Sequence, residues 1–248
     1  VVMTACIAPA SQYVDLVRHD SHIRLADYAR GLRFWLSNTS PRIVGIVFVE
    51  NSGHPLSALI EIAQAENKYG RPVEFMSVKA GDIPKDVSYG YSELEMVDEV
   101  VRNSELLTRA PYFIKATGRL SFPGVETLLE NINYPFKVAV DTRNDGFMRK
   151  RRRQFVSTQL MMVKCSTYKT DLIDKKKEMS GKWQMIEELY YDCLMPRNGE
   201  PGILLRFPIS VDPAGFAAHN GESYQSTKKT IAKYIRKIGR KCFPGCWM

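Results

Sequence analysis

Histidine and cysteine are scarce in this sequence. There are four histidines in the whole chain, and the five cysteines lie mostly inside apolar stretches. An odd number of scattered cysteines fits reduced thiols in a cytoplasmic protein better than a disulfide framework. Cys242 and Cys246 have no second Cys or His pair nearby, so the sequence gives no reason to expect a zinc site.

Long apolar runs are also missing. No run approaches the roughly 20 residues that a membrane-spanning helix needs. The apolar first residues lack the basic region that begins a signal peptide, and we expect a buried first strand there instead.

The sequence lacks the motifs of four common enzyme classes. No dinucleotide-binding glycine fingerprint follows the first predicted strand, and no G-x-x-x-x-G-K-[ST] loop occurs. G-x-S-x-G and H-E-x-x-H are absent too. These absences argue against a nicotinamide dehydrogenase, a P-loop NTPase and most hydrolases.

What is present is an ordinary globular composition with two basic clusters. Of the 248 residues, 44% are hydrophobic and 25% charged, which predicts a folded domain. The net charge of +8 comes largely from Met148–Arg153 and from Lys228–Lys241, which contains Lys and Arg but no acid. Such blocks indicate an anionic partner or a solvated tail.

Apolar runs alternate with helical periodicity along the chain, which predicts an α/β protein with a mostly parallel sheet and helices on both faces. We expect a single domain over residues 1–224 and a basic amphipathic C-terminal helix and tail over 225–248. Ser21 and the capping-box spacing Ser92–Glu95 are predicted to open two of the helices. The expected strands are Val2–Ala8, Ile43–Val49, Val73–Val78, a strand from Tyr112, Lys137–Val140, Gln159–Lys164 and Ile203–Val211.

Four of these strands end in the segments Ala8-Pro9, Glu50–Ser52, Lys115–Arg119 and Asp141–Arg143, of which the last three are polar. Ligands of an open α/β sheet lie outside the carboxyl ends of its strands, so we expect these residues to share one edge. Lys115 and Arg119 are suited to hold an anion, phosphate above all. The alternative is that both cations pair with surface carboxylates.

An ordered set of short segments gives the sequence a resemblance to a known family. The segments are T-A-C-I-A-P, R-L-A-D-Y, F-V-E-N-S-G, Y-G-Y-S-E, F-I-K-A-T-G-R-L and V-D-T-R, all within about the first 170 residues. Together they resemble the bacterial glycosyltransferases of lipopolysaccharide O-antigen and capsule assembly. The resemblance implies a GT-A-like, Rossmann-like fold. It also implies transfer of a sugar from a nucleotide-sugar donor to a lipid-linked glycan or polysaccharide acceptor.

The resemblance further implies roles for individual residues. Glu93, behind the Tyr89–Tyr91 loop, is the candidate acid/base. Its alternative is a helix-start carboxylate stabilised by the macrodipole. Glu50 is expected to form hydrogen bonds to the nucleoside. The alternative is that it is a carboxylate that stabilises the turn. The full set expected to bind the donor is Pro9, Arg24, Asp27, Glu50, Asn51, Ser52, Lys115, Thr117, Gly118, Arg119 and Arg143.

Metal use is left open by the residues. Where GT-A enzymes often carry an Asp-x-Asp pair, this sequence has Asp141-Thr142-Arg143. Asp141 is therefore a candidate catalytic residue and a candidate ligand of Mg²⁺ or Mn²⁺. A metal-independent enzyme, with Arg143 supplying the charge, is the alternative. His219 is not included among the metal ligands.

The basic segments suggest where the protein works. Lys228–Ile238 has an apolar and a cationic face, which is typical of a helix on an anionic membrane surface, with Phe243 and Trp247 beyond it. The alternative is a docked helix with solvated lysines. We expect a protein peripheral on the cytoplasmic face of the inner membrane, with no nucleic-acid partner. The alternative functions are a nucleic-acid-binding α/β protein and an inactive transferase fold that only binds nucleotide.

Overall fold

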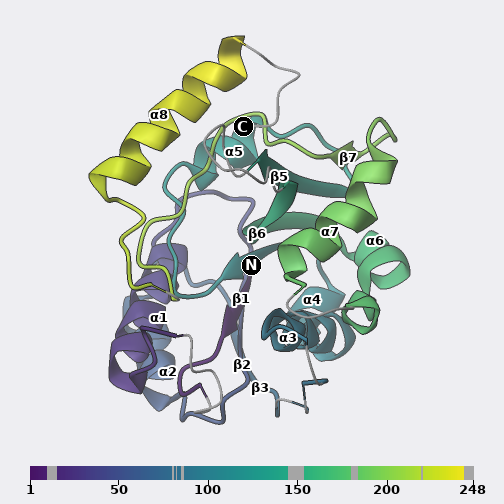
Figure 1. The fold of residues 1–248 in the computed structure, drawn as a ribbon. Helices are drawn as coiled ribbons and strands as arrows, with labels where there is room; N and C mark the ends of the chain where they lie inside the picture. The colour runs from purple at the N-terminus through teal and green to yellow at the C-terminus, as the bar shows by residue number, and fades with distance from the viewer. Residues whose placement is uncertain are drawn as a thin grey trace.

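A seven-stranded sheet runs through the computed structural model, which describes residues 1–9, 16–79, 81, 83–84, 87–144, 154–179, 184–218 and 220–242 (Figure 1). Its strand order is β3-β2-β1-β4-β6-β5-β7, and β6 alone among these seven runs antiparallel to its neighbours. The expected α/β class with a mostly parallel sheet is confirmed. The strands are β1 Val2–Ala5, β2 Ile46–Glu50, β3 Val73–Ser77, β4 Tyr112–Thr117, β5 Val138–Asn144, β6 Gln154–Lys164 and β7 Ile203–Leu204.

The second half of the sheet differs from the sequence prediction. The strand expected over Ile203–Val211 is only two residues long, and β6 begins five residues before Gln159. Asp141–Arg143 does not form a turn after a strand. It continues β5 beyond a register shift between Ala139 and Asp141, because β6 is long enough to pair with it through Asn144.

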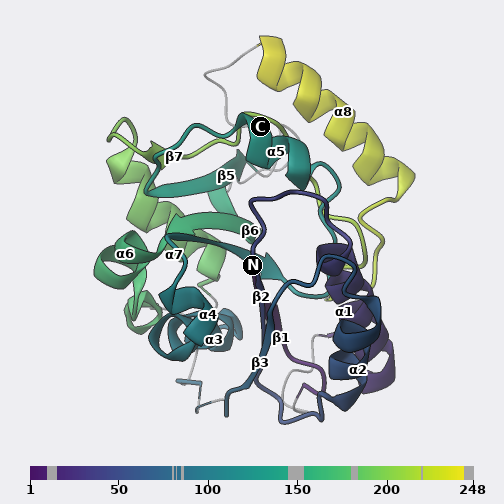
Figure 2. The same ribbon diagram turned by 180° about the vertical axis from the view of Figure 1, so that it is seen from behind.

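Helices cover both faces of the sheet, as Figures 1 and 2 show from opposite sides. One face carries α1 (Ser21–Leu36), α2 (Ser57–Glu66) and α5 (Val125–Asn131). The other carries α3 (Gly90–Asn103), α4 (Glu105–Thr108) and α7 (Ile186–Leu194). Short helical segments join β6 to α7 and follow α7: α6 Cys165–Thr167, η1 Tyr168–Leu172, η2 Lys175–Glu178 and η3 Met195–Arg197.

Two helices begin at residues other than those predicted. Asp20 caps α1, since its carboxylate accepts a hydrogen bond from the Ile23 amide at 2.9 Å, so Ser21 is the first helical residue. Helix α3 begins at Gly90, and Ser92 therefore lies inside its first turn. The capping-box prediction for Ser92 and Glu95 is wrong, because the Glu95 carboxylate accepts from the Gly81 amide instead.

The core follows from the alternation of side chains along each strand. Ile46 and Phe48 pack with α1 and α2 on one face, whereas Val47 and Val49 pack with α3 on the other. Because helices cover both faces of β2, its sequence is a continuous apolar run.

The last described helix, α8 (Thr227–Cys242), confirms and lengthens the helix predicted over Lys228–Ile238. It lies at the periphery, drawn yellow in Figure 1. Among the described residues, no helix is both long and apolar enough to cross a bilayer. Residues 145–153, with their basic run, as well as His219, Phe243 and Trp247, lie outside the described residues. The division at residue 225 stays a prediction.

Candidate functional site

The candidate site lies where the path of the chain through the sheet reverses. After β1 the chain adds β2 and β3 on one side, and β4 then returns to pair with the other side of β1. Open α/β sheets bind ligands at such a switch point, outside the carboxyl ends of the strands. A cavity of about 120 Å³ lies here, lined by Thr4 to Cys6 at the carboxyl end of β1 and by Thr117 and Arg119 at the carboxyl end of β4.

A buried ion pair forms the floor of the site. The Lys115 ammonium lies 2.5 Å from Glu93 Oε1 and donates to the Thr158 carbonyl at 2.6 Å. The Thr4 hydroxyl also donates to Glu93 Oε1, at 2.8 Å. Lys115 is buried, while the Glu93 side chain keeps 22% of its surface exposed and lines the cavity.

These contacts set the charge of Glu93. Burial alone would raise the pKa of its carboxyl group. The charge and hydrogen bond of Lys115, the hydrogen bond from Thr4 and the charge of Arg119 together more than offset this, and the pKa lies below its usual value. Glu93 is therefore ionised at neutral pH. Lys115 is not among the residues that line the cavity, and its ammonium group contacts Glu93 and the Thr158 carbonyl instead.

A second carboxylate, Glu187, lies at the start of α7. Its Oε1 accepts a hydrogen bond from the Thr158 hydroxyl at 3.1 Å, and Thr158 thereby links Glu187 to Lys115. Burial raises the pKa of Glu187, and the negative charge of Glu93 raises it further. Two carboxyl groups in one network thus have pKa values moved in opposite directions, the arrangement that separates acid from base roles.

Two buried polar atoms in the cavity wall have no hydrogen-bond partner among the described residues. They are Asn51 Oδ1, just beyond β2, and Ser92 Oγ, in the first turn of α3. A buried polar atom without a partner costs free energy, and native proteins leave few of them. Both atoms are suited to take up hydrogen bonds from a ligand.

Two arginines supply positive charge to the same cavity. Arg119 lines it and donates to the Phe216 carbonyl. Arg24 also lines it and donates to the carbonyls of Cys6 at 2.7 Å and Arg18 at 3.0 Å. Of the other predicted donor residues, Pro9, Asn51 and Thr117 line the cavity as well.

Glu50 and Ser52 are placed differently from the prediction. Glu50 is fully buried, and its Oε1 and Oε2 accept from the amides of Ile7, Ser52 and Gly53, each at 2.9 Å. The Ser52 hydroxyl accepts from the Ala8 amide at 2.9 Å and donates to Glu50. This geometry favours the alternative reading of Glu50 as a turn carboxylate, which fixes the loops after β1 and β2 around the cavity.

Asp27 and Gly118 likewise support the site without lining it. The buried Asp27 carboxylate pairs with Arg18 and with Arg30, each at 2.7 Å. The Gly118 amide donates to the Thr4 carbonyl at 3.0 Å, and a Cβ at Gly118 would lie 2.8 Å from that oxygen. Gly118 therefore lets the turn after β4 approach β1.

Asp141 and Arg143 lie on β5, which β6 separates from β4. Arg143 Nε donates to Asp141 Oδ2 at 2.9 Å, and its Nη2 lies 3.5 Å from Asp212 Oδ1. Within the described part of the chain, no group of three or more His, Cys, Asp or Glu residues is arranged to hold a metal ion. The described residues thus do not build a metal site from side chains alone, and Asp141 as a metal ligand stays a prediction.

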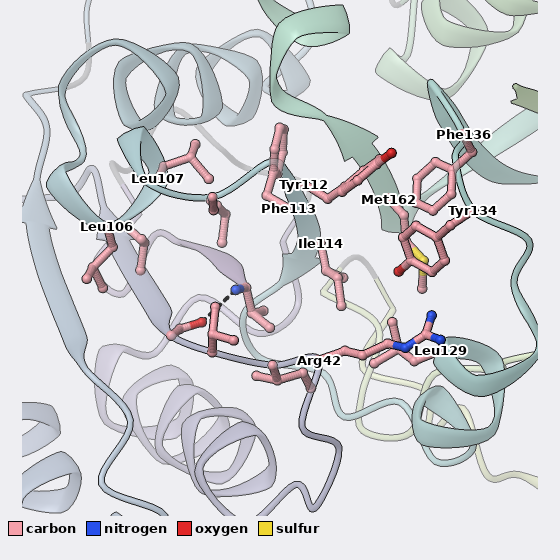
Figure 3. Close-up of a pocket in the computed structure, with 17 residues that line it drawn as sticks. Arg42, Leu106, Leu107, Tyr112, Phe113, Ile114, Leu129, Tyr134, Phe136 and Met162 are labelled. Carbon is pink, nitrogen blue, oxygen red and sulfur yellow. Dashed lines mark hydrogen bonds between the residues drawn. The ribbon is translucent and has the colours of Figure 1, made fainter.

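A second cavity, of about 80 Å³, lies at the amino ends of the strands and has a different character (Figure 3). Its wall is mostly aliphatic and aromatic, with Tyr112, Tyr134 and Phe136 close together. The Arg42 guanidinium lies 4.7 Å from the centre of the Tyr134 ring. With no carboxylate in its described lining, this cavity does not resemble a site for proton transfer.

Sequence reasoning missed Ser92 as a cavity residue and missed Glu187 and Thr158 altogether. Ser92 and Glu187 stand at helix starts, where Ser and Glu are common for local reasons. Thr158 precedes the segment predicted as a strand. No signal in one sequence distinguishes these residues from ordinary polar ones.

The fold is that of a Rossmann-like α/β protein, and the cavity at the switch point between β1 and β4 is its candidate ligand site. No family model matches the sequence, and no curated protein matches it. Solved structures that are similar to this chain over nearly its whole length include the following three. The inositol-1-phosphate CTP transferase from T. maritima is 11% identical, with a TM-score of 0.49 and 96% of each chain covered. A cytidylyltransferase from Leptospira borgpetersenii is 12% identical, with a TM-score of 0.44, covering 98% of this chain and 93% of its own. HddC from Yersinia pseudotuberculosis is 9% identical, with a TM-score of 0.41, covering 97% of this chain and 98% of its own.

Proposed function

We propose that the protein is a glycosyltransferase, which moves a sugar from a nucleotide-sugar donor to a lipid-linked or polysaccharide acceptor in bacterial surface-glycan assembly. The observation that carries the proposal is the cavity at the β1–β4 switch point. Its wall combines two buried oxygens that have no hydrogen-bond partner among the described residues, those of Asn51 and Ser92, with the cations Arg24 and Arg119. A nucleoside diphosphate offers the N–H and hydroxyl groups for the oxygens and the negative charge for the arginines.

In this proposal the donor is held along the edge of the sheet. Asn51 Oδ1 and Ser92 Oγ accept hydrogen bonds from the nucleoside. Arg119 and Thr117 lie at the end of β4, where they would contact the diphosphate. A fixed cation there stabilises the negative charge that develops as the nucleoside diphosphate departs.

Glu93 is the proposed base of an inverting transfer. The acceptor oxygen forms the new bond to the anomeric carbon while the bond from that carbon to the phosphate oxygen breaks, and the electron pair of the broken bond leaves on the diphosphate. The acceptor hydroxyl passes its proton to Glu93 Oε2, which accepts no hydrogen bond from a described residue. Lys115 keeps Glu93 ionised before the transfer.

The first test is a thermal-shift panel of UDP, GDP, CMP and dTDP, each with and without Mg²⁺ or Mn²⁺. A ligand that binds only the native state raises the melting temperature by mass action. A shift with one nucleotide identifies the donor class, and its metal dependence tests Asp141 as a ligand. The absence of any shift would contradict the proposal.

An absorbance excess at 260 nm after nuclease-treated purification would favour the nucleic-acid alternative.

Turnover is the second test. Glu93→Gln is expected to lower sugar transfer at least a hundredfold, the typical contribution of a general base, while the thermal shift with nucleotide is retained. Glu99→Gln on the same helix is the matched control and should leave both unchanged. Near-normal turnover of Glu93→Gln would remove the base assignment.

Two other outcomes would contradict glycosyl transfer. Nucleotide binding without turnover by the wild-type protein on any tested acceptor would favour the inactive-fold alternative. Release of pyrophosphate from a nucleoside triphosphate and a sugar phosphate would indicate nucleotidyl transfer instead.

We further propose that the protein works at the cytoplasmic face of the inner membrane, where a lipid-linked acceptor presents its glycan. The support is the amphipathic helix α8.

A further inference from the structure

Helix α8 contacts the body of the protein through its charged side. Arg236 Nη1 donates to Asp212 Oδ1 at 2.7 Å, and Lys229 Nζ lies 3.3 Å from Glu222 Oε2. The Lys229 ammonium also lies 4.5 Å from the centre of the Tyr224 ring. A surface helix ordinarily packs its apolar stripe against the core and turns its charges to water. In helix α8 the charged side contacts the body of the protein instead.

The apolar stripe of α8 is consequently exposed. Ile231, Tyr234, Ile235 and Ile238 follow the i, i+3, i+4, i+7 spacing of one helix face, and each is between 55% and 65% exposed. Four large apolar side chains in one row form a contiguous patch, which marks an interaction surface.

A cationic cleft of about 1040 Å³ lies beside this stripe, between α8 and residues 206–212. Lys233 and Lys237 line it from the helix, and Arg206 lines it from the facing segment. Asp212 is the one acid among its described lining residues, and Arg236 and Arg143 neutralise it. The cleft therefore carries net positive charge, and Tyr234 lies between it and the apolar stripe.

We propose that α8 and this cleft form a binding site for anionic phospholipid. The apolar stripe lies in the acyl region of one leaflet, and the cleft takes up the phosphate groups at the membrane surface. Charge complementarity supports this occupant, because Thr227–Cys242 contains no acidic residue. A second copy of the chain would bring the lysines of two α8 helices together, and a nucleic acid would leave the isoleucines in water. This lipid site deepens the proposed function. It rests on that function only in one respect, that the phosphate of a lipid-linked acceptor would lie at the same surface.

Vesicle flotation of the full chain tests the site without any turnover. Wild-type protein is expected to float with vesicles of phosphatidylglycerol and phosphatidylcholine at least tenfold more strongly than with pure phosphatidylcholine. Lys233→Gln with Lys237→Gln should weaken binding to the anionic vesicles about 30-fold, as expected for two lysines at a charged surface. Ile235→Ser with Ile238→Ser should weaken it at least tenfold through the lost apolar burial.

Matched controls lie at other surfaces. Val44 is 70% exposed at the amino ends of the strands, and Lys68 is exposed beyond α2. Val44→Ser and Lys68→Gln should leave vesicle binding unchanged. All variants should keep the nucleotide thermal shift of the wild type, so that loss of lipid binding is separated from misfolding and from failure of the proposed function.

Several results would overturn the proposal. One is equal binding to neutral and anionic vesicles, or no binding. Another is a wild-type dimer that the isoleucine double variant converts to monomer, since that makes a second copy the occupant. A third is binding to nucleic acid that requires Lys233 and Lys237 but not the isoleucines. A thermal shift with inorganic diphosphate, lost in the lysine double variant, without any vesicle binding would assign the cleft to free phosphate.

Discussion

At the scale of single residues, the cavity wall contains buried oxygens that have no hydrogen-bond partner in the part of the chain that the structure describes. Ser92 Oγ and Asn51 Oδ1 have lost hydrogen bonds to water on folding and have gained none from the described residues. Such a group lowers the stability of the free protein, whereas a ligand that bonds to it recovers the loss. The two effects can be measured separately.

The substitution Ser92→Ala is expected to separate the effect on stability from the effect on ligand binding. Without ligand, the free energy of unfolding should stay the same or rise, within about 1 kcal/mol, because an unsatisfied polar atom is removed. The dissociation constant of the nucleotide identified by the thermal-shift panel should rise about tenfold, as for the loss of one hydrogen bond. Denaturant unfolding and titration calorimetry measure the two quantities.

Ser166→Ala, at an exposed serine, is the control for both measurements. Lower stability together with unchanged affinity would show that Ser92 has only a structural role.

Glu187 gives a prediction for pH dependence. Burial raises its pKa in the folded protein above the value of the unfolded chain, so the folded state holds this proton to higher pH. Stability is therefore lost as the pH rises from the ordinary glutamate pKa of about 4.3 through the raised value. Glu187→Gln removes this loss while the amide oxygen can still accept from Thr158.

The variant should accordingly match the wild type near pH 4 and be more stable than it at pH 7, as measured by denaturant unfolding. Glu99→Gln provides the control profile. Parallel stability curves for the wild type and Glu187→Gln across this range would contradict the raised pKa.

Residue roles were only partly predictable from the sequence. Residues at the carboxyl ends of β1, β2 and β4 do line one cavity, because the carboxyl ends of parallel strands meet at one edge. Which way each side chain points was not predictable. Glu50 turns into the loop amides and Lys115 toward Glu93. Both positions are buried, and each side chain has a partner from a distant segment, Ile7 for Glu50 and Glu93 for Lys115.

At the scale of elements, helix α1 and the turn after β4 approach each other with almost no space between them. A Cβ added to Gly31 would lie 2.0 Å from the Gly118 carbonyl oxygen. Glycine at position 31 is what allows α1 to pack this closely against the edge that carries Thr117 and Arg119.

Gly31→Ala is therefore expected to destabilise the protein by about 3 kcal/mol, because a backbone oxygen cannot move away as a side chain would. Gly45→Ala is the matched control. Its Cβ would meet its nearest neighbour at 3.4 Å, an ordinary contact, and its effect should stay within about 1 kcal/mol. Denaturant unfolding measures both. Equal effects of the two substitutions would contradict the close approach.

The type of an element, helix or strand, was predictable where the hydrophobic periodicity was strong. The direction of a strand and its partners in the sheet were not. The apolar spacing of the sequence predicts a helix face of Leu25, Ala29, Leu32 and Leu36, flanked by Tyr28 and Trp35. In α1 all of these are buried except Leu25, which is partly buried. The antiparallel direction of β6 was not predictable, because a strand has the same period whichever way it runs. Its pairing with β4 and β5 comes from tertiary packing.

At the scale of the whole molecule, the strand order determines where the site lies. The reversal between β3 and β4 leaves the crevice beside β1, and the helices on both faces close its sides. The sequence predicted the alternation of strands and helices from which such a sheet is built. It did not predict the order of the strands, since nothing in a local pattern says that β4 returns to β1.

That order has a consequence for synthesis of the chain. Val2 pairs with Val47 on one side of β1 and with Lys115 on the other. As the protein leaves the ribosome, β1 to β3 are complete long before β4 exists, and β1 carries an open edge of unpaired amides and carbonyls for nearly half the chain. The nascent protein thus passes through a period in which its central strand has an edge open to pairing with another strand.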